Sequence, residues 1–458
     1  MYQESVQSRI NLATTSASSP SLNNTLFITA NTYFKERLRG YNSFDEVKAD
    51  DAIPTQSNAY KGLQIAFKRT SAVPIFLGRR EVSTPKFEVT SNTVGQDITI
   101  TVDVINETDN TSVSTAIKYT ILPEDDTTAK VAAKVQALLD AVTNIGATVA
   151  DSTLTITPEA NYAVVTTTIL NMKDVSTSTE TAATLLSAIQ DEDNESWYFL
   201  TCEDHTQEFI LAMANEIEAT ESGNYPKQYH TSTQDANSIV PLVTPAIDVL
   251  GKLSELNFVR TRAQWHNLAD SNFIEVADTA YNGQFQAGVT TWKFMPAIGG
   301  VTAASDPVTG KPLATSKQGY IRDRNASWYG IERGVNFSHG GMQSSGEWTD
   351  IVQSKDWLND TIEVRLTNLL LNQVGGKIPL NSAGKRLVEN VIDGVLNEAV
   401  SLGILTGYLP AQCPETNSFE DQAARILKGV KWTGFLAGAV HFIIVDGILT
   451  YADEEVAE

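Results

Sequence analysis

The chain has 458 residues, more than one hydrophobic core usually serves, so two to four domains are expected. Its 33 lysines and arginines stand against 55 aspartates and glutamates, and the net charge of -22 argues against binding to nucleic acid or to an anionic membrane surface. Hydrophobic residues make up 42% of the chain, which excludes a largely disordered protein.

The two cysteines, Cys202 and Cys413, lie far apart, which favours a reducing compartment over a disulfide framework. The first residues show no basic segment followed by an apolar one, so no signal peptide is expected. The longest apolar stretch, about 435–449, includes His441 and Asp446 and is too short to span a bilayer. We therefore expect a protein that is made and folded in the cytoplasm.

Residues 1–22 are polar, but Val6, Ser8, Ile10 and Leu12 alternate with longer polar side chains. This period-two pattern is typical of a strand, yet no second strand lies near it in the sequence. Two interpretations stay open: a frayed terminus, or an arm that adds a strand to the sheet of a neighbouring subunit.

The next segment, 23–84, has the pattern of an α/β layer. An apolar strand is predicted at 25–30, a helix at 58–69 and a second strand at 73–78, with a short helix capped by Ser43 in between. The order strand, helix, strand predicts two parallel strands joined by helical crossovers.

Residues 85–178 differ in character, being rich in threonine and in strictly alternating strands. We predict strands at 98–104, 116–121 and 154–157, and an amphipathic helix at 128–142. The segment is predicted to be a self-contained β-rich insertion within a discontinuous core.

The α/β pattern resumes over 179–437, which with 23–84 is predicted to form that core; the stretch near 265–345 is a candidate subdomain within it. The predicted elements are strands at 197–201, 227–231 and 257–264 and helices at 207–219 and 244–256. The fold class expected is therefore mixed α/β, with a mixed sheet flanked by helices.

The last third carries the strongest helical patterns. Helices are predicted at 355–372 and 382–402, the second capped by Ser382, and the break at 377–379 favours a helical hairpin. The final stretch, 438–458, is predicted to be a linking strand and an acidic tail. Its alternating run at 440–451 includes Val440, Phe442 and Ile444, and the acidic residues follow at 453–455.

No motif for catalysis or metal binding is present in the sequence. The five histidines are scattered without a HExxH pair, and neither cysteine lies in a CxxC motif. Gly310-Lys311 lacks the upstream glycine of a P-loop, and no GxSxG elbow exists. We predict no enzyme, no cofactor and no metal site.

Several segments, taken in order, resemble the tail sheath proteins of contractile bacteriophages. The most specific of these stretches runs from DWL at 356–358 through KIP at 377–379 to AG at 383–384. It is similar to the C-terminal helical pair of one branch of these sheaths. The other similar stretches are NTLFI at 24–28, RGYNSFDEV at 39–47, IFLGRR at 75–80, RTR at 260–262, TWKF at 291–294, GGVT at 299–302 and LAGAVH at 436–441.

The resemblance implies a structural subunit whose terminal arms add strands to the sheets of adjacent subunits. It implies hexameric rings stacked into a helical sleeve around the tail tube, which contracts to drive the tube through the host envelope. The partners implied are further copies of the chain, the tail tube protein, and baseplate and tail terminator proteins, in a virion assembled in host cytoplasm, with an insertion that faces outward. The strands expected between subunits contain Val6, Ser8, Ile10, Leu12, Val440, Phe442 and Ile444.

Arg425, Lys428 and Lys431 are predicted to form a basic strip toward an acidic tail tube. An ordinary cluster of cations at a helix C-terminus is the alternative for these three residues. For the chain as a whole, the alternatives are another phage tail or baseplate protein, or a glycan-binding adhesin or enzyme suggested by the threonine-rich insertion.

Overall fold

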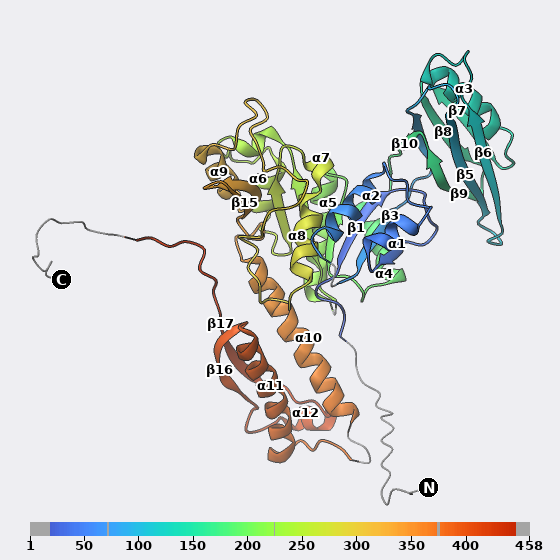
Figure 1. Ribbon diagram of the computed structural model, residues 1–458. Helices are drawn as coiled ribbons and strands as arrows, with labels where there is room; N and C mark the ends of the chain where they lie inside the picture. The colour runs from blue at the N-terminus through green and yellow to red at the C-terminus, as the bar shows by residue number, and fades with distance from the viewer. Residues whose placement is uncertain (1–18, 71–72, 224, 373–375, 446–458) are drawn as a thin grey trace, which may run out of the picture.

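The computed structural model describes residues 19–70, 73–223, 225–372 and 376–445 (Figure 1). Its central element is an eight-stranded sheet in which the two edge strands, β15 and β2, are antiparallel and the strands between them are parallel. In spatial order the strands are β15 (Val335–His339), β14 (Ser327–Glu332), β13 (Thr261–Trp265), β12 (Gln228–Thr233), β11 (Phe199–Cys202), β1 (Thr25–Ala30), β3 (Ile75–Arg80) and β2 (Leu38–Tyr41).

Helices cover both faces of this sheet, which explains why inner strands such as β11, β12 and β13 are buried along their whole length rather than at alternate residues. In β1, Leu26 and Ile28 pack on one helical layer and Phe27 on the other. The first layer contains α4 (Ala182–Glu192), α5 (Gln207–Ala219) and α6 (Val249–Glu255); the second contains α1 (Phe44–Ala49), α2 (Asn58–Phe67) and α8 (Ile274–Gly283).

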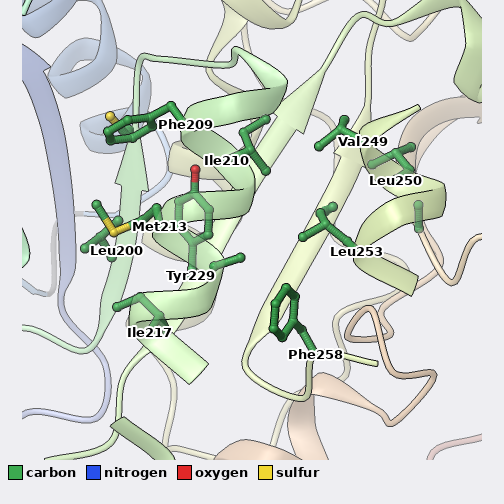
Figure 2. Close-up of a cluster of buried hydrophobic side chains, with 14 of the residues drawn as sticks. Leu200, Phe209, Ile210, Met213, Ile217, Tyr229, Val249, Leu250, Leu253 and Phe258 are labelled. Carbon is green, nitrogen blue, oxygen red and sulfur yellow. The ribbon is translucent and has the colours of Figure 1, made fainter. Parts of the chain in front are cut away.

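Figure 2 shows the first layer, where the apolar side chains of α5 are directed at Leu200 and Tyr229 of the sheet. On the opposite face α2 approaches the sheet so closely that a Cβ on Gly62 would lie 2.1 Å from the Phe27 ring. Glycine at this position therefore permits the close packing of α2 on β1.

Residues 86–174 lie apart from the eight-stranded sheet, at one end of the molecule (Figure 1). They form a four-stranded and a three-stranded sheet around their own apolar cluster, and the chain leaves and returns at adjacent points, because the Val175 amide donates to the Lys86 carbonyl at 2.9 Å. The elements are β4 (Lys86–Val89), β5 (Asp97–Asn106), β6 (Ser112–Thr120), α3 (Thr128–Leu139), β7 (Ile145–Ala150), β8 (Thr153–Pro158), β9 (Tyr162–Leu170) and β10 (Met172–Asp174).

The C-terminal helices project from the other side of the core (Figure 1). The first half of α10 (Thr349–Leu371) is buried in the core, and its second half packs against α11 (Ser382–Leu402). Beside α11 lies a two-stranded sheet of β16 (Leu405–Gln412) and β17 (Lys431–Leu436), with α12 (Phe419–Ala424) in the connection. The predicted helical hairpin is thus confirmed.

Several boundaries predicted from the sequence are wrong. The helix predicted at 355–372 begins earlier, at Thr349, and the strand predicted at 257–264 begins later, at Thr261. The helix predicted at 244–256 begins only at Val249, where the Asp248 carboxylate accepts the Gly251 amide and caps it. Ser382 is the first residue of α11 and not its cap, because the Asn381 side chain accepts the amides of Ala383 and Gly384. The short elements that remain are α7 (Ala269–Asn272), α9 (Thr315–Arg322) and the 3-10 turns Thr220–Ser222 and Ala236–Ile239.

Candidate functional site

A buried polar cluster joins α10 to the sheet. Arg260, directly before β13, donates from both terminal nitrogens to the two carboxylate oxygens of Asp356, each at 2.8 Å. The Tyr198 hydroxyl donates to the same carboxylate at 2.6 Å, and Gln228 donates to that hydroxyl at 2.9 Å. Burial alone would lower the pKa of Arg260, but Asp356 outweighs it and raises the pKa, so the guanidinium stays charged and holds the helix.

A second buried cluster is the nearest approach to catalytic chemistry. His205 lies between Asp270, 3.0 Å from Nδ1, and Glu275, 3.2 Å from Nε2. Burial acts to lower the pKa of His205, but the two carboxylates prevail and raise it to about 10. Ser232 Oγ lies 3.4 Å from Nε2, yet this serine is fully buried, and a protonated imidazole has no lone pair to accept its proton. The cluster therefore serves structure.

The described residues offer no site for a metal ion: they contain no group of three or more His, Cys, Asp or Glu side chains arranged to hold one. Among the described helices, none has the length and apolar character needed to cross a membrane.

The surface most suited to association is the β16–β17 sheet. Within the described part of the chain no third strand pairs with it, although the Ala411 amide of β16 donates to the Asp393 carboxylate of α11 at 2.7 Å. Several of its apolar side chains are also exposed, with Leu409 at 55% and Phe435 at 49%. An edge of this kind can accept a strand from another chain.

The segment that follows β17 forms no helix or strand over 437–445. Its apolar side chains are among the most exposed of the described residues: Val440 at 72%, Phe442 at 69% and Ile444 at 88%. These three predicted linking residues therefore do not pair with their own subunit. The remaining predicted linking residues, Val6, Ser8, Ile10 and Leu12, and the rest of the predicted strand, 446–451, lie outside the described residues.

Two residues of this segment contact the core: the Lys293 ammonium lies 3.8 Å from the centre of the Phe442 ring, and His441 makes several contacts. His441 Nε2 lies 2.6 Å from Thr291 Oγ1, and Lys293 Nζ donates to the His441 carbonyl at 2.6 Å. The ring also meets the edge of Trp348, at the start of α10, with centroids 4.3 Å apart. His441 therefore fixes the point from which the exposed segment leaves the subunit.

Ser21 and Leu22, near the first of the described residues, are hydrogen-bonded to the core and to α10. The Ser21 amide donates to the Glu195 carbonyl at 2.7 Å, and the Gln353 side chain of α10 donates to the Leu22 carbonyl at 3.0 Å. Residues that precede Ser21 therefore begin beside α10, the helix that carries the C-terminal sheet.

The three predicted tube-facing cations lie on the exposed connection from α12 to β17. Arg425 follows α12 in a left-handed conformation with φ 58, Lys428 pairs with Asp421 at 2.8 Å, and Lys431 opens β17. The structure brings them onto one connection, and it also places Arg425 on the rim of an apolar groove. One signal for that groove is visible in the sequence: the leucine stripe of α10 continues past the part of the helix that the core covers.

Comparison with known families identifies the C-terminal helices. Residues 349–412 match the family described as "E217 tail sheath protein gp31-like, C-terminal domain". This match covers α10, α11 and β16. No curated protein matches the chain by sequence.

Solved structures share the fold along almost the whole chain. A chain of the anti-feeding prophage baseplate is 11% identical with a TM-score of 0.55, and one of the contracted anti-feeding prophage helical sheath is 11% identical with a TM-score of 0.54; each match covers 98% of this chain and 100% of the other. The sheath tail protein of Listeria innocua is 9% identical with a TM-score of 0.47, over 92% of this chain and 96% of that one.

The shared fold extends beyond the matched helices to the eight-stranded core, in agreement with the expected fold class. Residues 349–412 therefore match the C-terminal domain of a tail sheath protein family, and the chain as a whole shares its fold with chains of the anti-feeding prophage baseplate and helical sheath.

Proposed function

We propose that copies of this chain polymerise by exchanging terminal strands. The observation that supports this most directly is the coexistence of an unpaired two-stranded sheet and an extended, exposed apolar segment, 440–445, in one subunit. Adding such a segment to a sheet edge satisfies backbone hydrogen bonds and buries apolar side chains at once. Residues 6–12, with their alternating pattern, are proposed as a second donated strand.

The proposed assembly is a sleeve of stacked hexameric rings around a tail tube. Two likenesses support it: one solved relative belongs to a baseplate described as 6-fold symmetrised, the other to a helical sheath. The described contacts also favour a subunit that moves as one piece, since α10 is locked to the core by Arg260 and Asp356. Contraction is then a change in packing between subunits while the exchanged strands keep them connected.

In this proposal the sleeve is part of a phage virion, assembled in the host cytoplasm, and its partners are the tail tube, baseplate and tail terminator proteins. Residues 85–178 are proposed to face outward, because they lie at the end of the molecule opposite the C-terminal sheet (Figure 1). Lys428 and Lys431 remain proposed tube contacts, and reversing their charges should weaken tube attachment without stopping sleeve assembly.

Electron microscopy of the purified chain tests the proposal. Wild-type protein should form hollow striated sleeves, whereas a variant without residues 1–20 should stay a soluble monomer. Normal sleeves from that variant would contradict a role for the N-terminal strand.

A second variant tests the other donated strand. Phe442→Asp with Ile444→Asp should also abolish sleeves, because both side chains become charged where a partner would bury them. Val113→Asp is the matched control: Val113 is 67% exposed, close to Phe442 at 69%, but lies on β6, far from either chain end. Sleeves should form from the control.

A further inference from the structure

A groove of about 740 Å³ runs between the second half of α10, the start of α11 and the connection after α12. Its walls are mostly apolar, including Leu366, Leu370, Val388 and Ile426. Leu370 is 67% exposed, so the groove is open, and a large apolar surface of this kind usually marks a binding site.

The described charged residues that line the groove are all cationic. Lys377, Lys385 and Arg425 line it, and no aspartate or glutamate among the described residues does. Lys385 donates to the carbonyls of Pro414 and Glu415, whereas Lys377 and Arg425 make no ion pair within the described residues. In a chain with a net charge of -22, an apolar groove whose charged lining is cationic selects an occupant that is apolar and acidic.

The chain itself contains such a segment. Ile448, Leu449 and Tyr451 are apolar or aromatic, and Asp453, Glu454 and Glu455 follow directly. We propose that residues 446–458 of a second copy of this chain occupy the groove. The proposal rests on assembly by exchanged chain ends and names the surface that receives the last part of the C-terminal arm.

Strand direction supports this placement. The groove includes Val430, and β17 begins at the next residue, Lys431. A strand that pairs antiparallel with β17 runs from its Leu436 end to its Lys431 end, so whatever follows that strand arrives beside Val430. The acidic residues that follow the apolar run would thus be delivered to the cationic wall.

Geometry favours a second copy over the same subunit. His441 is held against Trp348, and Leu370 lies 22 residues further along α10, about 33 Å away at 1.5 Å per residue. Ile448 and Leu449, seven and eight residues beyond His441, reach at most about 25–29 Å even when fully extended. Ile448 and Leu449 therefore cannot reach Leu370 of their own groove.

A labelled peptide of residues 446–458, titrated into the full-length chain kept from assembling by Phe442→Asp with Ile444→Asp and followed by fluorescence anisotropy, tests the site. Arg425→Glu and Leu370→Asp should each weaken binding at least tenfold. Arg386→Glu and Leu371→Asp are matched controls, because both side chains are exposed beside the groove without lining it. Wild-type affinity for Arg425→Glu and Leu370→Asp would overturn the site.

A variant peptide tests the charge of the occupant. The triple change Asp453→Asn, Glu454→Gln and Glu455→Gln removes the three acidic groups and keeps the side-chain shapes. This peptide should bind the same non-assembling chain at least tenfold more weakly than the unchanged peptide, because the cationic wall loses its counter-charges. Equal affinity of the two peptides would contradict recognition by charge.

The donor is identified in sleeves assembled from mixed ¹⁵N-labelled and unlabelled chains. Carbodiimide should link Lys377 to an acidic residue of 453–455, and the linked peptides should include pairs of mixed label. Links found only within single chains would overturn the second-copy assignment. Absence of sleeves would count against the proposed function, while sleeves without peptide binding would count against this inference alone.

Discussion

Arg260 and Asp356, 96 residues apart in the chain, form a two-point ion pair with both nitrogen–oxygen distances at 2.8 Å. Their side chains are 1% and 3% exposed. One belongs to the sheet core and the other to α10, so the pair is the main polar connection between the core and the helix that carries the C-terminal sheet.

Removing one charge of this pair should be costly. Asp356→Asn keeps the side-chain shape but leaves the Arg260 cation short of a buried counter-charge, so the free energy of unfolding should fall by about 3–5 kcal/mol. Urea denaturation measures this loss, and Glu363→Gln, an exposed change on the same helix, should stay within about 0.5 kcal/mol of wild type. A small effect of Asp356→Asn would mean that the apolar contacts of α10 suffice.

The His205 cluster predicts a pH dependence. The pKa of His205 is about 10 in the folded chain and about 6.5 in the unfolded chain. The protonated ring therefore stabilises the fold fully below pH 6.5, and this stabilisation is lost as the pH rises toward 10. His205→Gln should lower the free energy of unfolding by about 2–4 kcal/mol at pH 6, and by clearly less at pH 10. Urea denaturation at both pH values checks this. In the control His339→Gln, whose native pKa is about 4, the difference from wild type should not change between pH 6.5 and 10.

Two glycines of α11 should respond in opposite ways to alanine. A Cβ on Gly384 would lie 1.9 Å from the Pro379 carbonyl oxygen, whereas nothing lies within 4 Å of a Cβ on Gly394. Gly394→Ala should raise the free energy of unfolding by about 0.5–1 kcal/mol, the usual helix preference for alanine. Gly384→Ala should lower it by about 1–3 kcal/mol, because the backbone must shift. Thermal unfolding of both variants measures these changes. Equal changes in the free energy of unfolding would contradict the packing described at Gly384.

The contacts of His441 predict how firmly the C-terminal segment is held. His441→Ala removes the Thr291 contact and the Trp348 ring contact, so backbone amides of 437–445 should exchange with deuterium several times faster. Val440→Ala, at a side chain 72% exposed, is the control and should change little.

Burial, and then Lys293, lowers the pKa of His441, so the docked segment favours the neutral ring. Acidification below about pH 6.5 should therefore loosen this segment in the wild type but not in His441→Ala. Mass spectrometry of the exchanged protein at pH 7.5 and pH 5.5 reads out both effects, after correction for intrinsic exchange rates.

Elements whose pattern is local could be predicted from the sequence. The bounds of α5 and α11 are as expected because each carries a continuous apolar stripe. The β16 strand was missed because Gly407 and Pro410 interrupt its alternation, and both are tolerated only because the strand lies at an edge. The β14–β15 hairpin was missed as well.

The parts of the site that depend on long-range register could not be predicted. Nothing local links Arg260 to Asp356, or Thr291 to His441 across 150 residues. The groove is assembled from three separate segments, and its lining becomes apparent only once α10 and α11 are placed side by side. The linking residues remain a prediction that rests on a local signal, because alternation is a property of a single segment.

The adjacency of Lys86 and Val175 has a consequence for how this molecule can be altered. The polypeptide leaves the core at Lys86 and returns beside it at Val175. None of the strands between these two residues pairs with the eight-stranded sheet. Residues 87–174 are thus joined to the core by neighbouring chain ends, so a foreign domain whose own termini lie close together should be accepted in their place and be displayed by every subunit.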